Sequence, residues 1–261
     1  MAFILYISMS TSFSSHALLR RNILNKFGLG KPANGHTFYC FSPPVMLATM
    51  AIETCLALYT ILRFRHGLFA KLTVLTLLLL AFFQLAEYEI CADSGKLAWS
   101  RLGLIAITFL PAVGLHMVAV VSKKRIYLSF GYAFAAALSL YFAFGPASGI
   151  GSFCGGNYII FNWPREVFIF YAIYYGGFLT LAIWKSLVAL NLSHSKRIHN
   201  TLKWLMIGYS TFMVPVGIVY AFYAPARMAV ASIMCGFAVT LAFILTFMVV
   251  PNYYKYSYSA K

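Results

Sequence analysis

The chain has 261 residues, of which 62% are hydrophobic and only 10% are charged, and its mean hydropathy is +0.81. A soluble globular domain carries about 25% charged residues, so this composition excludes an ordinary water-soluble fold and indicates a polytopic membrane protein. The net charge of +15 comes from Lys and Arg in short runs between apolar segments, so we expect a lipid bilayer as partner and no nucleic acid.

Residues 1–40 precede the first long apolar segment. A short apolar stretch is followed by Ser and Thr, and residues 16–31 then carry four Lys and Arg among Leu, Ile and Phe, without an acid. This pattern is typical of an amphipathic surface helix or a targeting segment. We therefore interpret residues 1–40 as a basic amphipathic or targeting-like extension. Translation from Met9 is an open alternative.

Seven apolar segments follow, each close to the roughly 20 residues that cross a hydrocarbon core. They predict an all-α fold, a bundle of seven transmembrane helices within residues 41–251. A short cytoplasmic tail follows at residues 252–261, and no loop is long enough for a second domain. The predicted spans are 43–64, 69–91, 99–122, 126–145, 166–190, 202–223 and 228–250.

The distribution of Lys and Arg predicts the orientation of this bundle. Eleven of these residues flank one side of the spans, and four flank the other side. We therefore expect the N-terminus outside and the C-terminus in the cytoplasm, in a bacterial inner (plasma) membrane. The basic residues of the extension oppose this orientation, which marks that region as atypical. The eleven are Arg63, Arg65, Lys71, Lys123, Lys124, Arg125, Lys196, Arg197, Lys203, Lys255 and Lys261; the four are Lys96, Arg101, Arg165 and Arg227.

The five cysteines form no Cys-x-x-Cys motif and have no paired zinc-type spacing. The predicted topology places Cys40, Cys91 and Cys154 on the outer side, where an oxidising compartment allows two of them to pair. A Cys91–Cys154 disulfide would tie the end of the second span to residues 146–165 and hold that loop as a lid over a pocket. A plain surface loop is the alternative.

Polar side chains inside the spans are the candidate functional residues, because an ionisable group there costs roughly 2.5 to 3.5 kcal/mol on insertion scales. Glu53 lies near the middle of the first span, and Gln84 and Glu87 share one helical face near the outer end of the second. His116 lies in the third span, one turn past a proline. Glu89 projects to another side, nearer water, so we expect it at the interface.

Three interpretations of these residues stay open. At a rise of about 1.5 Å per residue, Glu53, Glu87 and His116 descend through the membrane rather than meet at one level, which disfavours a shared metal ion. A water-filled cleft or proton path through the first three helices fits this arrangement, since intramembrane carboxylates and histidines recur in such relays. A structural cluster, with a protonated Glu53 hydrogen-bonded to Gln84 or His116, is the alternative.

The fifth span contains Tyr171, Tyr174 and Tyr175 directly before Gly176-Gly177. Hydroxyl groups beside helix-breaking residues can line a polar cavity. A glycine pair more often allows two helices to approach closely, and tyrosines near span ends act as interfacial anchors. We therefore expect a close helix contact at the glycine pair.

Missing motifs remove several enzyme classes. The chain has no GxSxG, Walker A or HExxH sequence, so no motif indicates a hydrolase, an NTPase or a zincin. The last span contains no Lys, so a retinal Schiff base of the microbial-rhodopsin type has no amine there. His116 is the one histidine in a span, unlike the several intramembrane histidines of seven-helix zinc hydrolases related to alkaline ceramidases. Any cofactor is undetermined.

Three short motifs together resemble a known family. Cys40-Phe41-Ser42 before the first span, Glu53 within it and Gln84-x-x-Glu87 in the second resemble a bacterial family of multi-pass membrane proteins that has no assigned activity. The resemblance covers residues 40–91 and implies a similar topology. In that family Cys-Phe-Ser lies close to the start of the chain, so the basic residues 1–39 are a departure that favours an added targeting segment or a different start.

The sequence thus predicts an integral membrane protein that accepts a lipid, a small molecule or a proton in a polar cleft among the first three helices. Glu53, Gln84, Glu87 and His116 are the candidate residues, without a metal ion and without an assigned catalytic residue. Two alternatives stay open: a structural or accessory subunit that contacts a membrane-protein partner, and a metal-dependent intramembrane enzyme.

Overall fold

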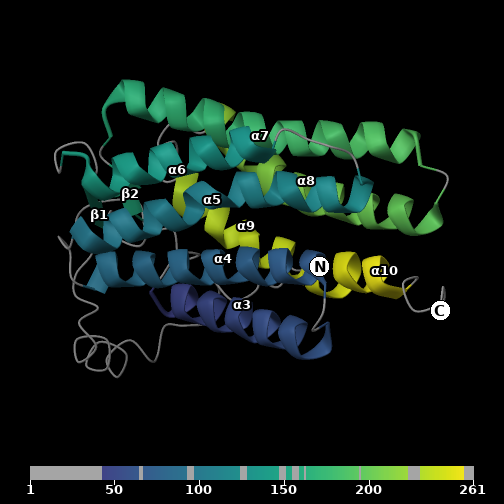
Figure 1. The fold of residues 1–261 in the computed structure, drawn as a ribbon. Coiled ribbons are helices and arrows are strands. Elements are labelled where there is room, and N and C mark those ends of the chain that lie inside the picture. Colours follow the sequence, from purple (N-terminus) through teal and green to yellow (C-terminus); the bar gives the residue numbers. More distant parts are fainter. Residues whose placement is uncertain are drawn as a thin grey trace.

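The computed structural model describes residues 43–255 except 65–66, 93–96, 124–127, 147–150, 155–158, 162, 194 and 223–229. Within these residues the chain forms a bundle of helices, which confirms the predicted all-α class (Figure 1). The basic extension, its Cys-Phe-Ser motif and the last six residues lie outside the described part. The helices are α3 (Pro43–Arg63), α4 (Leu68–Ala92), α5 (Leu97–Ser122), α6 (Leu128–Phe144), α7 (Arg165–Asn191), α8 (Lys196–Phe222), α9 (Val230–Ile244), the π-helical turn η4 (Leu245–Val249) and α10 (Val250–Lys255).

Five of the described helical stretches are long and apolar enough to cross a membrane: α3, α4, α5, α7 and Gly236–Tyr254. Helix α6 is apolar but shorter, with 17 residues, and α8 has 27 residues. The chain therefore has the helices of an integral membrane protein. Its helices lie at about the same positions as the seven predicted segments, and five stretches are both long enough and apolar enough to cross a membrane.

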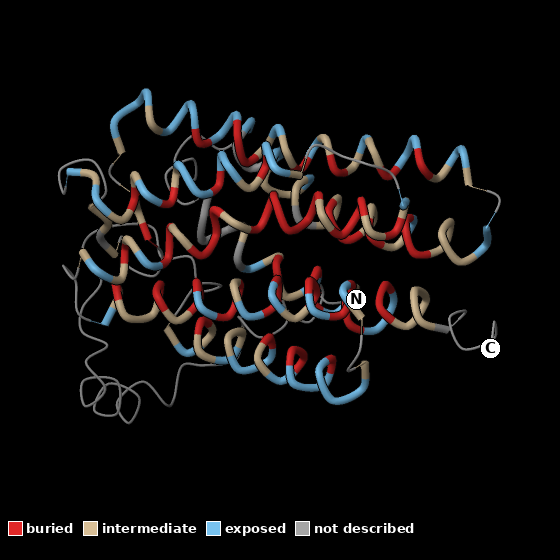
Figure 2. Tube along the Cα trace, in the orientation of Figure 1, coloured by how far each residue is buried: buried red, intermediate tan, exposed pale blue. Residues whose placement is uncertain are grey.

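Helix α5 is the centre of the bundle, since it contacts α4, α6, α7 and α8. Figure 1 shows α3, α4 and α5 as successive neighbours, with α7 and α8 on the other side of α5. Most of the α5 surface is buried, whereas α3, α6 and α7 each bury one stripe and leave the remainder exposed (Figure 2). Because the exposed stripes consist largely of Phe, Leu and Ile, they are suited to contact with lipid.

The two ends of the bundle differ. A small β-hairpin lies where α4 ends and α5 begins, and we call this the hairpin end. Helix α10 lies at the opposite end, which we call the tail end (Figure 1). There Tyr253 stacks on Phe69, and the Tyr254 hydroxyl accepts a hydrogen bond of 3.3 Å from the Ala70 N–H in the first turn of α4. The helical part of the described chain thus continues to Lys255.

Tyrosines of α7 and α8 bind backbone carbonyls of the central helix. Tyr174 donates to the Thr108 carbonyl oxygen at 2.7 Å, and Tyr209 donates to the Gly114 carbonyl oxygen at 3.1 Å. The two carbonyls lie on either side of Pro111, whose missing N–H interrupts the helical hydrogen bonds of α5. Tyr174 is therefore a buried support of α5 and not an interfacial anchor.

Glycines allow close helix contacts at positions other than the predicted pair. A Cβ atom added at Gly131 would lie 3.0 Å from the Phe178 ring, and one at Gly103 would lie 3.0 Å from the Ala86 side chain. At Gly176 and Gly177, among the described residues, no atom beyond the chain neighbours and the helix's own local backbone lies within 4 Å of such a Cβ. The expectation of a close contact at this pair is wrong, because the pair lies on a face of α7 that other helices do not cover.

Candidate functional site

Glu53 lies on the buried stripe of α3, with Met46, Leu56, Ala57 and Thr60. Its side chain is 0% exposed, and neither carboxylate oxygen has a hydrogen-bond partner among the described residues. An isolated carboxylate in an apolar interior is strongly unfavourable, so such a group is retained when it is protonated or bound to a ligand. The Glu53 carboxyl group therefore needs a proton or a donor that the described residues do not supply.

Gln84 and Glu87 lie on the buried side of α4 and are 3% and 1% exposed. The Glu53 and Glu87 carboxyl groups are close enough for their charges to interact. Side chains lean toward the N-terminus of their own helix, so those of the antiparallel helices α3 and α4 converge between these two positions. Two negative charges at this depth repel strongly, so the pair is stable when it holds a proton or a cationic group.

The geometry of Glu53, Gln84 and Glu87 therefore forms a cluster rich in hydrogen-bond acceptors, which we call the carboxyl site. It contains the oxygens of two carboxyl groups and one amide carbonyl. A donor-bearing ligand, of which a proton is the simplest, would satisfy the two Glu53 oxygens, which have no hydrogen-bond partner among the described residues. Of the four residues that the sequence indicates, Glu53 and Glu87 thus lie near each other, and Gln84 lies about one turn from Glu87 on the same face of α4.

His116 lies elsewhere. Its Nδ1 shares a hydrogen bond of 3.0 Å with the hydroxyl of Tyr132 on α6, so the ring occupies the α5–α6 interface and not the α3–α4 interface. Among the described residues no three His, Cys, Asp or Glu side chains form a group that could hold a metal ion. The expected route through the first three helices thus does not extend to His116, because this residue is on the side of α5 that α6 covers.

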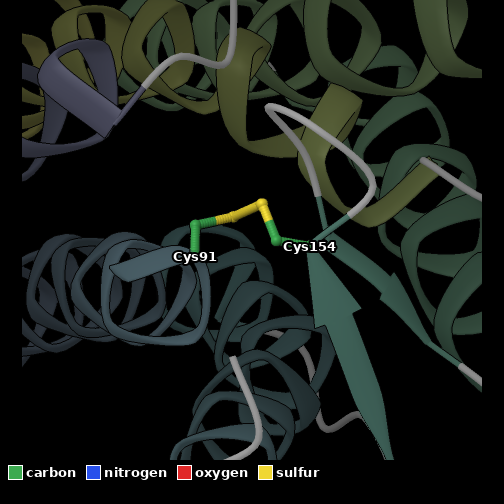
Figure 3. Close-up of a disulfide and its surroundings, with 2 residues drawn as sticks. All are labelled: Cys91 and Cys154. Atoms are coloured by element: carbon green, nitrogen blue, oxygen red, sulfur yellow. A yellow bond between two sulfur atoms is a disulfide. The ribbon is translucent and has the colours of Figure 1, made fainter. Parts of the chain in front are cut away.

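The loop at residues 146–165 contains a two-stranded hairpin rather than a plain connection. Strand β1 (Ser152–Cys154) pairs antiparallel with β2 (Ile159–Phe161). Cys154 forms a disulfide with Cys91 in the last turn of α4, with 5.0 Å between the Cα atoms (Figure 3). Ser152 also hydrogen-bonds Ser100 of α5. The hairpin is thereby attached to two helices at the hairpin end.

This attachment lies next to the carboxyl site. Cys91 follows Glu87 by four residues and therefore projects from the same face of α4, one turn nearer the hairpin end. The ring of Phe161 on β2 lies 6.5 Å from that of Phe83, next to Gln84 in sequence. The hairpin thus restrains the C-terminal end of α4, which is the end of this helix nearest to the carboxyl site.

Two further polar features are not apparent from the sequence. Arg101 donates hydrogen bonds to the carbonyl oxygens of Ala143 and Gly145, the second at 2.8 Å, and so satisfies the C-terminal end of α6. Three threonines on α3, α4 and η4 are completely buried: Thr60, Thr73 and Thr246. The signal for Thr60 is its position seven residues after Glu53, on the same helical face.

No protein-family model matches the chain, and no curated protein is significantly similar to it. The resemblance in residues 40–91 therefore stays an expectation, and the carboxyl site is interpreted from its own geometry.

Proposed function

We propose that the chain crosses the membrane seven times, with its N-terminus outside and its C-terminus in the cytoplasm of a bacterial cell. The five span-capable helices support this proposal, and α6 and α8 pack against two of them, α5 and α7. The excess of Lys and Arg at the tail end supports the orientation. In this orientation the disulfide lies on the outer, oxidising side of the membrane, where disulfides persist.

We propose that the carboxyl site binds a proton together with a small molecule or lipid that carries a cationic or hydrogen-bond-donating group. The observation that supports this most is the Glu53 carboxyl group, which is completely buried and has no donor among the described residues. Acceptor oxygens without donors select a ligand that supplies donors. The nearby Glu87 favours a positive charge or a proton in the same place.

The two alternative functions gain less support. An accessory subunit whose acids contact a partner's helices needs those acids at the surface, whereas Glu53 and Glu87 are 0% and 1% exposed. A metal-dependent enzyme needs a ligand set, and the described residues contain no suitable group of three. Binding within the bundle therefore accounts best for both acids.

A membrane-permeant carbodiimide tests this proposal, because it modifies protonated carboxyl groups in apolar surroundings. The full-length protein in mild detergent at neutral pH is treated with the reagent, and modified peptides are located by mass spectrometry. We expect modification at Glu53, its absence in Glu53→Gln, and slower modification when a lipophilic ammonium compound is present. Glu53→Gln should keep its expression level and melting temperature.

Glu89 supplies the matched control on the same protein, since it is half-buried near the end of α4. Its carboxyl group reaches water and should react with a water-soluble carbodiimide instead. Failure of the permeant reagent to modify Glu53 would contradict a protonated, ligand-accessible carboxyl group and would remove the proposed function.

A further inference from the structure

Helices α3, α4 and α9 meet in a small apolar layer on the tail-end side of Glu53. Its members are the side chains of Leu56, Ala57, Leu77 and Ala242. The next layer toward the hairpin end is reached by moving four residues along each helix. It contains Glu53 on α3, Ala81 on α4 and Ala238 on α9, which are four residues from Ala57, Leu77 and Ala242. Because four residues make about one helical turn, Glu53 is the one large side chain of that next layer.

A hydroxyl layer lies on the opposite side of the apolar layer. Moving four residues along each helix toward the tail end leads from Leu56, Leu77 and Ala242 to three threonines. These are Thr60, Thr73 and Thr246, and each is 0% exposed. The same step of about one turn, or roughly 6 Å, separates each from the apolar layer. The interface of α3, α4 and α9 thus alternates between a carboxyl group, an apolar barrier and three hydroxyl groups.

A ring contact fixes the level of α3 against η4 independently. The rings of Tyr59 and Phe247 lie 5.6 Å apart, and both side chains are more than 40% exposed. Thr60 and Thr246 are their sequence neighbours and are buried, so these two hydroxyls turn inward at the same level.

Thr246 is the unusual member of the hydroxyl layer. Thr60 and Thr73 donate to the carbonyls of Leu56 and Phe69, at 2.8 and 3.1 Å, and keep their lone pairs as acceptors. The Thr246 Oγ1 atom is buried and has no hydrogen-bond partner among the described residues. It lies in the π-helical turn η4, where the Val250 N–H bonds the Leu245 carbonyl. Such turns occur frequently at functional sites.

We propose that the α3–α4–α9 interface conducts protons, with Glu53 as the carrier, the apolar layer as the barrier and the threonine layer as the relay toward the tail end. This inference rests on the proton site of the proposed function. The Glu53 carboxyl group releases its proton toward the threonines and regains one from the side of Glu87. Each hydroxyl group gives up its own proton as it accepts the next, so the relay is unchanged after each transfer.

The barrier explains how such a path avoids a free leak. Glu53 and Thr60 are separated by seven residues, or about 10 Å along the helix axis, so hydrogen-bonded water must bridge them. Leu56 and Leu77 occupy that gap. Proton transfer therefore requires these leucines to move aside, and smaller side chains should make it faster.

Few other ionisable groups compete with Glu53 along this path. Glu87 on α4 is the one other acid that the described residues bury. Residues 236–249 of α9 and η4 contain no ionisable side chain. Arg63 and Lys71 are exposed and lie at the tail ends of α3 and α4. They are therefore near the tail-end opening of the path and not near Glu53.

Proton flux into proteoliposomes tests the inference. The full-length protein is reconstituted with a pH-sensitive dye inside, and a potassium gradient with valinomycin supplies the driving force. We expect flux above that of protein-free vesicles, its loss in Glu53→Gln and Thr246→Val, its return in Thr246→Ser, and an increase in Leu77→Ala. Thr76→Val is the matched control: Thr76 is on α4, but its hydroxyl group contacts the Met117 sulfur of α5, so its flux should equal wild type.

Wild-type flux equal to that of protein-free vesicles, or unchanged flux in Thr246→Val, would overturn the path. Carbodiimide labelling of the same samples separates the two proposals. Labelling of Glu53 without wild-type flux overturns the path and leaves the carboxyl site in place. Absence of labelling overturns the carboxyl site itself. Loss of flux in Thr246→Val with labelling retained supports the relay.

Discussion

Replacing Glu53 by Met should stabilise the protein while it abolishes ligand binding. Met has a similar length and no polar oxygen, so the substitution removes two buried acceptors that lack donors among the described residues. Insertion scales assign roughly 2.5 to 3.5 kcal/mol to a charged group in a span, and an unsatisfied buried group costs roughly 1 to 3 kcal/mol. We therefore expect a gain of about 2 kcal/mol in the free energy of unfolding.

Thermal melting in mild detergent, followed by the fluorescence of the four tryptophans, measures this gain. The melting temperature should rise by several degrees, since about 1 kcal/mol shifts a chain of this size by roughly 2 to 4 °C. Ile52→Met is the matched control, because Ile52 is next to Glu53 but 37% exposed toward the lipid side. It should change stability by less than about 0.5 kcal/mol.

A fall in the melting temperature of Glu53→Met would refute this reasoning. It would mean that the carboxyl group is satisfied in the native protein and holds the helices together. The structural-cluster interpretation would then replace the carboxyl site as a place for ligands.

Three further changes test the fold. Cys91→Ser removes a cross-link between residues separated by 63 positions, worth up to roughly 4 kcal/mol of chain entropy, so the variant should melt lower and lose its sensitivity to reductant. Gly67→Ala places a Cβ atom against the Tyr254 hydroxyl and should lower the melting temperature by displacing α10, whereas Gly177→Ala meets nothing and should be neutral or stabilising by up to about 1 kcal/mol. Tyr209→Phe removes one buried hydrogen bond to α5 and should cost about 1 kcal/mol, measured by the same melting assay. If Cys91→Ser, Gly67→Ala or Tyr209→Phe melted at the wild-type temperature, the disulfide, the α10 contact or the hydrogen bond to α5, respectively, would not stabilise the protein as argued.

The positions of the helices were accessible from composition alone. Residues 43–64 predict the first helix and the structure has Pro43–Arg63, because a membrane span is set by its length and its lack of charge. The two acids and the glutamine could likewise be selected by their cost in an apolar segment. These inferences depend on one segment at a time.

Features that depend on two segments were less accessible. The side of a largely apolar helix that meets each neighbour has little periodic signal, so the sequence could not show that His116 faces Tyr132 of α6. Three-residue strands are too short to leave an alternating pattern, so the hairpin at Ser152–Phe161 was not predicted. The π-helical turn around Thr246 has no sequence signature of its own.

The Cys91–Cys154 disulfide also closes a covalent ring that contains all of α5 and α6. The ring can close only when the hairpin lies against the end of α4, so its closure marks the completion of that half of the bundle. A single protease cut between α5 and α6 would then leave one covalently connected molecule, which reductant alone would separate into two pieces. The central helix is therefore held in place by chain connectivity as well as by packing.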